Sequence, residues 1–160
     1  MNIREIRELI RETIDNHLKE VKTYVVDKSQ EALEDEMYDA QGEVQTFLRP
    51  SVDGYPEDSY EDLFGDYEHP EVVLMSDIVS DSDIRGIKMM ISKQGKYGQE
   101  VIDSLKDAML NGRPIPPVTV LTKQPWKNNF YLISGRHRIL AALELGLTHI
   151  PVLKMYRRNG

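Results

Sequence analysis

The chain has 160 residues, a net charge of −7 and no cysteine. This length suits one domain, or one domain with an appendage, and is enough to bury a hydrophobic core. The absence of cysteine excludes disulfide scaffolds, thiol nucleophiles and cysteine-ligated metals, and it fits a reducing compartment. The charged first residues do not resemble a signal peptide, and no run approaches the ~18 apolar residues of a membrane span. We therefore expect a soluble cytoplasmic protein without membrane contact.

The charge is divided unevenly along the chain. Residues 1–75 carry 7 Lys and Arg against 20 Asp and Glu, a net −13, whereas residues 76–160 carry 13 against 7, a net +6. The two halves could dock together, the basic half could bind an anionic ligand, or the acidic half could repel nucleic acid. Charge alone leaves these alternatives open.

The first 49 residues are predicted to be a helical N-terminal region. Apolar residues recur at steps of three and four from Ile3 to Val25, which predicts one long amphipathic helix. Asn2 and Glu5 have the spacing of a capping box at its start. The apolar stripe favours packing on the helix's own domain over pairing with a second copy of the chain, which would make a homo-oligomer. A second helix is predicted from Lys28 to Val44.

Residues 50–70 gather Pro, Gly, Tyr and acidic residues without periodicity, which predicts an acidic linker or loop. The order of elements after it predicts an α/β (α+β) domain over residues 71–160, a small mixed sheet packed with helices. The expected elements are a strand at 71–79, a loop-rich stretch with a short helix at 81–98, a helix from 99 that stops at Asn111-Gly112, strands at 116–121 and 129–134, a helix at 136–145 that stops at Gly146, and a strand at 148–156.

The stretch SGRHR, residues 134–138, places three cations where the last of these helices begins. A helix N-terminus presents unpaired N–H groups and favours an anion, so cations there without an acid indicate that a negative group is missing from the chain. Gly135 allows close approach of a ligand, and arginine and histidine side chains donate to phosphate oxygens. The pattern is a phosphate cradle in outline, although solvent-facing arginines and a packed histidine would explain it equally well.

Three segments, VIDSLKDAMLNGRPIPPVTVL, FYLISGRHRILAALELG and HIPVL, together resemble the ParB/sulfiredoxin superfamily over about residues 72–155. The resemblance implies binding of ATP or CTP, with the phosphates against the loop from Ser134 to Arg138. Gly135 would be the close-approach glycine, His137 and Arg138 the phosphate-contacting pair, and Arg136 the variable position. Members of this superfamily include a sulfinic-acid repair enzyme, a serine kinase, CTP-dependent partition clamps and domains described as nucleases, so the fold leaves the function open.

Departures from the superfamily pattern narrow these functions. Sulfiredoxin chemistry uses a cysteine at the position of Arg136, so we reject that activity. Partition proteins add a helix-turn-helix reader after this domain, whereas this sequence ends at Gly160, and the −13 charge of the N-terminal half argues against DNA binding. Many relatives carry an acid at the position of Ser134, which puts metal or base chemistry at that position in doubt.

Catalysis of phosphotransfer or nucleic-acid cleavage would need a carboxylate to bind Mg²⁺ or accept a proton. Asp77, Asp81, Asp83 and Glu100 precede the motif and are weak candidates, since acids are common in turns and at helix starts. Lys96, between two glycines, resembles part of a flexible phosphate-reaching lid. The histidines show no metal-ligand spacing, so no structural metal is predicted.

The leading hypothesis is a ParB/sulfiredoxin-like domain that binds a nucleoside triphosphate at residues 134–138, with Mg²⁺ as an accompanying ion and NTPase or phosphotransferase activity left open. The alternatives are a non-enzymatic interaction or regulatory protein, whose acidic N-terminal region binds a partner, and a ParB-like nuclease.

Overall fold

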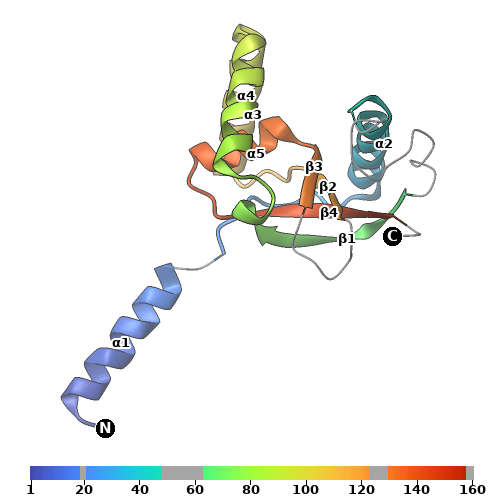
Figure 1. Cartoon of the computed structure of the whole chain (residues 1–160). Coiled ribbons are helices and arrows are strands. Elements are labelled where there is room, and N and C mark those ends of the chain that lie inside the picture. Colours follow the sequence, from blue (N-terminus) through green and yellow to red (C-terminus); the bar gives the residue numbers. More distant parts are fainter. Residues whose placement is uncertain (19–20, 48–62, 123–129, 158–160) are drawn as a thin grey trace.

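A computed structural model describes residues 1–18, 21–47, 63–122 and 130–157 of the chain (Figure 1). Within these ranges the fold is α+β with a mixed sheet and an N-terminal helix, as predicted from the sequence. The elements in chain order are α1 (Ile3–Leu18), α2 (Gln30–Phe47), β1 (Leu63–Leu74), the 3₁₀ helix η2 (Met75–Asp77), α3 (Asp81–Lys93), α4 (Lys96–Leu110), β2 (Val118–Thr122), β3 (Phe130–Ser134), α5 (Arg136–Glu144) and β4 (His149–Arg157).

The four strands form one sheet in the order β1-β4-β2-β3. The central pair, β2 and β4, is parallel, and the two outer pairs are antiparallel. Every residue of β2 is buried, so this strand is covered on both faces. The sequence identified this strand from its short run of β-branched residues, which pack well on a sheet.

The two faces of the sheet pack against different helices. Val118 and Val120 belong to the main hydrophobic core, which also holds buried residues of α3, α4 and α5. Thr119 alternates with them and points to the other face, where its hydroxyl donates to Glu36 of α2. Figure 1 accordingly shows α2 standing apart from the group formed by α3, α4 and α5.

Local signals set the ends of the helices that position β3 and α5. Ser80 and Asp83 form a capping box at the start of α3, with the Ser80 hydroxyl accepting from the Asp83 N–H at 3.1 Å. Gly112 and Gly146 adopt positive φ of 67° and 75° just after α4 and α5, which confirms the two predicted stops. The prediction of a loop-rich stretch at 81–98 is wrong, because α3 occupies most of it and α4 begins at Lys96.

The N-terminal helix is shorter than predicted. α1 ends at Leu18, and its capping box is confirmed, with the Glu5 N–H donating to Asn2 at 2.8 Å. The chain from Lys22 to Asp27 is extended and hydrogen-bonds to Thr148 and Ile115, so Val21 and Val25 do not continue the helix. Tertiary packing competes with the local helical pattern here. Tyr24, in the middle of this segment, is buried in the core with 3% of its surface exposed.

The apolar face of α1 does not cover its own domain at the residues whose side chains are described. Ile3 and Ile10 are 70% and 53% exposed, and Figure 1 shows the helix extending away from the sheet. The sequence-based preference for packing on the same domain is therefore wrong for this part of the helix. No helix in the described ranges is long and apolar enough to cross a membrane.

The predicted second helix is confirmed as α2, but the predicted linker is too long. β1 begins at Leu63, so residues 63–70 are strand where a loop was predicted. Pairing with β4 explains the difference, because a strand at the sheet edge tolerates the Pro and acidic residues that suggested a loop. The rest of that prediction, residues 50–62, lies outside the described residues.

Candidate functional site

Gly135 joins β3 to α5 in a conformation that few other residues could adopt. Its φ is 114°, and a Cβ placed there would lie 2.4 Å from Cγ1 of Val118. Backbone of this kind lets the start of α5 press against β2. Because glycine has no side chain to cap the helix, the first-turn N–H groups receive no capping oxygen from this position.

The three cations that follow Gly135 do not converge on one point. Successive helical residues project about 100° apart, so Arg136, His137 and Arg138 leave α5 in different directions. Arg136 lines a cavity beside α3, His137 meets Gln94, and Arg138 turns toward α2. The loop therefore separates two sites, one on each side of the start of α5.

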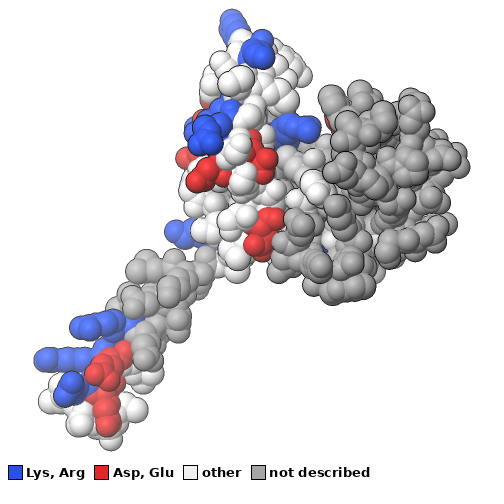
Figure 2. Space-filling view, viewed as in Figure 1, with Lys and Arg blue, Asp and Glu red and all other residues white. Residues whose placement is uncertain are grey.

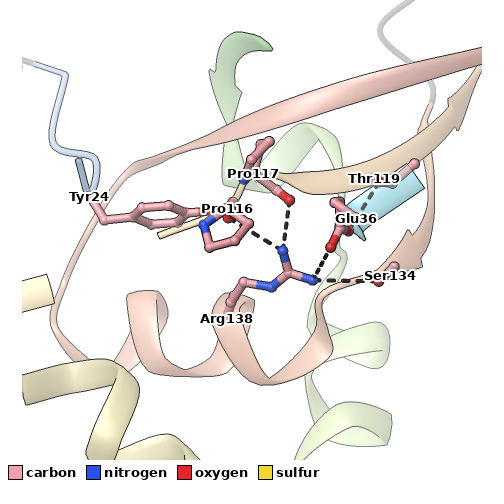
Figure 3. A network of polar contacts seen from close by, with 7 residues as sticks. All are labelled: Tyr24, Glu36, Pro116, Pro117, Thr119, Ser134 and Arg138. Atoms are coloured by element: carbon pink, nitrogen blue, oxygen red, sulfur yellow. Dashed lines mark hydrogen bonds and ion pairs between the residues drawn. The ribbon is translucent and has the colours of Figure 1, made fainter. Parts of the chain in front are cut away.

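Arg138 is held by a network of buried partners (Figure 3). Its Nη2 lies 2.9 Å from Oε2 of Glu36 in an ion pair whose side chains are 15% and 4% exposed. Nη1 donates to the carbonyl oxygen of Pro117 at 2.7 Å, and Nη2 lies 3.4 Å from the Ser134 hydroxyl. The sequence predicted that the negative partner of these cations lies outside the chain; for Arg138 that partner is Glu36, 102 positions earlier in the sequence.

Burial dominates the electrostatics of this network. Desolvation raises the pKa of Glu36 above its usual value of 4.5, although the charge of Arg138 and hydrogen bonds from Arg138 and Thr119 act in the opposite direction. Burial also raises the pKa of Tyr24, whose hydroxyl donates to the Pro116 carbonyl oxygen at 2.6 Å. The side chain of Glu36 thus carries a charge at a substantial desolvation cost, which its contacts with Arg138 and Thr119 offset.

Arg136 faces different surroundings. It lines a cavity of about 400 Å³ between α3, β3 and the start of α5. The other walls are mostly apolar, with Ser82 and Asp83 as polar members. The apolar lining consists of Ile78, Val79, Ile87, Met90, Phe130 and Leu132, with Tyr131 and Gly86 completing the wall. An apolar cavity with a few polar groups at one end is the usual form of a small-molecule site.

His137 lies between the two sites. Its Nε2 is 2.6 Å from Oε1 of Gln94, the residue that caps the C-terminus of α3. Desolvation lowers the pKa of His137 below 6.5, and the charges of Arg138 and Arg136 lower it further. The imidazole therefore favours its neutral form, which leaves it free to take up a proton when a negative charge approaches.

The weaker candidates from the sequence are scattered. Asp83 lines the Arg136 cavity, but its carboxylate also accepts from the Ser80 N–H and hydroxyl in the capping box. Lys96 and Glu100 form an exposed ion pair at 3.7 Å on α4, so Lys96 lies in a helix and the lid prediction is wrong. Asp77 ends η2, and Asp81 is the first residue of α3. No three His, Asp or Glu side chains among the described residues are grouped so that they could hold a metal ion.

Glu36 is the main residue that sequence reasoning missed. It lies on the buried face of α2 with Leu33 and Ala40, which are 6% and 0% exposed. A charged residue at the spacing of an apolar stripe is a signal that the sequence does contain, because charged side chains are seldom fully buried unless they are paired. Thr119 and Tyr24 gave no such signal.

The geometry defines a class of protein. It is an α+β domain in which a glycine turn joins a strand to a helix whose first turn is rich in cations. Residues 75–156 match the ParB N-terminal domain, and the chain belongs to that family. The resemblance to the ParB/sulfiredoxin superfamily inferred from the sequence is therefore confirmed. A comparison with curated proteins gives no match.

Proposed function

We propose that the chain binds a nucleoside triphosphate, ATP or CTP, at the loop from Ser134 to Arg138. The observation that carries the proposal is the position of Arg136, a cation at the N-terminus of α5 that lines a cavity of about 400 Å³. The nucleoside occupies the apolar part of this cavity. The phosphates lie against Arg136, His137 and the N–H groups that begin α5.

Three properties of the described residues support this arrangement. The N-terminal end of α5 carries a partial positive charge and no acidic residue in its first turn. Gly135 removes the side chain at the turn where phosphate oxygens approach. The lowered pKa of His137 leaves a proton to be gained as negative charge arrives. Membership of the ParB N-terminal domain family supports the same function.

Calorimetric titration with ATP, CTP and GTP in the presence of Mg²⁺ tests the proposal. We expect heat from at least one nucleotide and an affinity loss of about ten- to a hundredfold in Arg136→Ala, the cost of one charge-assisted hydrogen bond. Arg4→Ala is the matched control, because Arg4 is an exposed arginine on α1 that pairs with Glu8 far from the loop. Absence of heat with all three nucleotides, or equal affinity in Arg136→Ala and wild type, contradicts the proposal.

A reaction on the bound nucleotide, either hydrolysis or phosphotransfer, is a further part of the proposal. Asp83 is the acid that lines the Arg136 cavity and is therefore the candidate to hold Mg²⁺ beside the phosphates. Phosphate release should then require Mg²⁺ and fall in Asp83→Asn. The variant Asp103→Asn, which alters an acid on α4 that hydrogen-bonds Gln99, controls for loss of a surface charge.

A second candidate function is a regulatory or adaptor protein that binds a protein partner through its N-terminal region. The observation that favours it is the exposed apolar face of α1, where Ile3, Ile6 and Ile10 are 70%, 43% and 53% exposed. A second copy of the chain is one such partner. Deletion of residues 1–18 tests this function, since α2 and the segment around Tyr24 are parts of the domain and must be retained. An oligomeric state by light scattering and a partner binding that are both unchanged after the deletion contradict this function.

A further inference from the structure

The ion pair between Glu36 and Arg138 links two parts of the chain, only one of which the family pattern includes. Arg138 is one of the two residues that the family pattern places on phosphate, yet its guanidinium is occupied by a carboxylate of its own chain at 2.9 Å. Glu36 comes from α2, outside the residues 75–156 that match the family. The pair therefore joins the N-terminal region to the candidate nucleotide site.

The contacts of Glu36 are those that a phosphate group would make. One carboxylate oxygen accepts from the Arg138 guanidinium and the other accepts from the Thr119 hydroxyl at 3.0 Å. Arg138 is further oriented by the carbonyl oxygen of Pro117 and by Ser134, so its fork points at Glu36 even before a ligand arrives (Figure 3). A planar guanidinium binds carboxylate and phosphate oxygens in the same geometry.

The surroundings of this ion pair prevent Arg138 from holding Glu36 and a phosphate at the same time. A cavity of about 420 Å³ next to Arg138 is lined by five acids, with Arg138 as its only cationic lining residue among those described. The acids are Asp27, Glu31, Asp35, Glu36 and Asp39. A phosphate that reached Arg138 from this side would meet uncompensated negative charge, so Glu36 and a phosphate cannot both hold the guanidinium.

We propose that Glu36 is a built-in phosphate substitute, which holds Arg138 while the site is empty and is displaced when a triphosphate binds at the start of α5. This inference rests on the proposed function, and it adds the regulation of that site by α2. When Glu36 loses Arg138, its carboxylate is left buried without its cation, and the contact between α2 and the sheet weakens. Nucleotide binding is thereby coupled to release of the N-terminal region.

The direct test compares nucleotide affinity in the wild type and in Glu36→Gln, a variant with the same shape and no charge. We expect Glu36→Gln to bind the triphosphate about tenfold more tightly, because the competing anion is gone. Asp35→Asn is the matched control. It removes the same charge from the neighbouring residue of α2 and from the same cavity wall, and it should change the affinity by less than about threefold.

Hydrogen exchange provides the second readout. It is measured on the wild type, so it does not require any variant to fold. Saturating the wild type with the nucleotide that binds should speed amide exchange in α2, residues 30–47, while exchange in α5 slows. Amide exchange in α2 that is unchanged or slower on binding overturns the inference.

The outcomes separate the inference from the proposed function. Binding of no triphosphate to either the wild type or Glu36→Gln overturns the proposed function and the inference with it. Binding of equal strength to the wild type, Glu36→Gln and Asp35→Asn overturns the inference alone. Binding to both proteins that is tighter in Glu36→Gln than in the wild type, and unchanged in Asp35→Asn, supports both.

Discussion

Arg136 and Arg138 lie two residues apart in α5 and meet opposite surroundings. Arg136 lines a cavity that is mostly apolar, whereas Arg138 is held by a buried carboxylate, two proline carbonyls and a serine hydroxyl. Two residues apart on a helix means about 200° of rotation, so neighbouring charges face opposite sides. A cluster of cations in the sequence is therefore not necessarily a cluster in space. In this site Arg138 is held by residues of its own chain, whereas Arg136 lines a cavity.

The largest expected effect is a difference in the free energy of unfolding between variants of the two arginines. Arg138→Ala should lower the free energy of unfolding by about 3–5 kcal/mol, because it leaves Glu36 buried without a cation. Arg136→Ala should change it by less than about 1 kcal/mol, since Arg136 is only partly buried and lines a cavity. Urea denaturation of both variants measures this difference, and similar losses in the two would contradict the distinction.

Gly135 lies between the two sites, and its replacement should have the next largest effect on stability. Gly135→Ala should cost about 2–4 kcal/mol from overpacking against Val118 and from the positive φ. Gly146→Ala is the control, because Gly146 also has a positive φ but open space around its Cβ position, so only about 1 kcal/mol is expected. Equal losses in the two variants would mean that the contact with Val118 is relieved by a small backbone shift.

The pH dependence of stability is a further test of the buried pair between Glu36 and Arg138. Because burial raises the pKa of Glu36 above 4.5, the stability linked to its proton is fully present below pH 4.5 and is lost as the pH rises through the raised pKa. The wild type should therefore gain stability relative to Glu36→Gln as the pH falls from neutral toward 4.5. Denaturation curves of both proteins across this range give the difference, and parallel profiles would show that Glu36 does not carry it.

The smallest effect concerns His137 on the ligand side. Its pKa is lowered below 6.5 in the free protein, and a bound triphosphate would raise it, so binding takes up a proton. Nucleotide affinity should then grow by about two- to tenfold more in the wild type than in His137→Asn as the pH falls from neutral to below 6.5. Titration of the nucleotide itself is common to both proteins and cancels in this comparison. Identical pH profiles would place His137 outside the phosphate site.

Charge on the exposed surface bears on the alternative of nucleic-acid binding. On the face shown in Figure 2, basic and acidic side chains are interspersed over α3, α4 and α1 among the residues that are not drawn in grey. Among the described residues of this face, the split of −13 and +6 along the sequence is therefore not visible as two separate surfaces. The Glu36–Arg138 pair shows one reason, since part of the two opposite charges is paired internally.

Local signals made much of the fold predictable. The stops at Gly112 and Gly146, the capping box of α1 and the buried strands β2 and β4 were all readable, because each depends on residues within one turn or one strand. The failures lie where distant contacts compete with local ones. The helical pattern through Val21 and Val25 gave way to an extended segment, since hydrogen bonds to Ile115 and Thr148 and burial of Tyr24 stabilise it more.

By itself the sequence determined the class of fold, the ParB N-terminal domain family and the position of a glycine turn followed by three cations. It determined these because periodicity, helix stops and motif spacing are local properties of the chain. Only the tertiary structure decided what each cation faces. The partner of Arg138 lies 102 positions away, on a helix that the family pattern does not include. Packing of α2 against the sheet brings Glu36 to Arg138, and the desolvation of both groups makes the pair a part of the fold as well as of the candidate site.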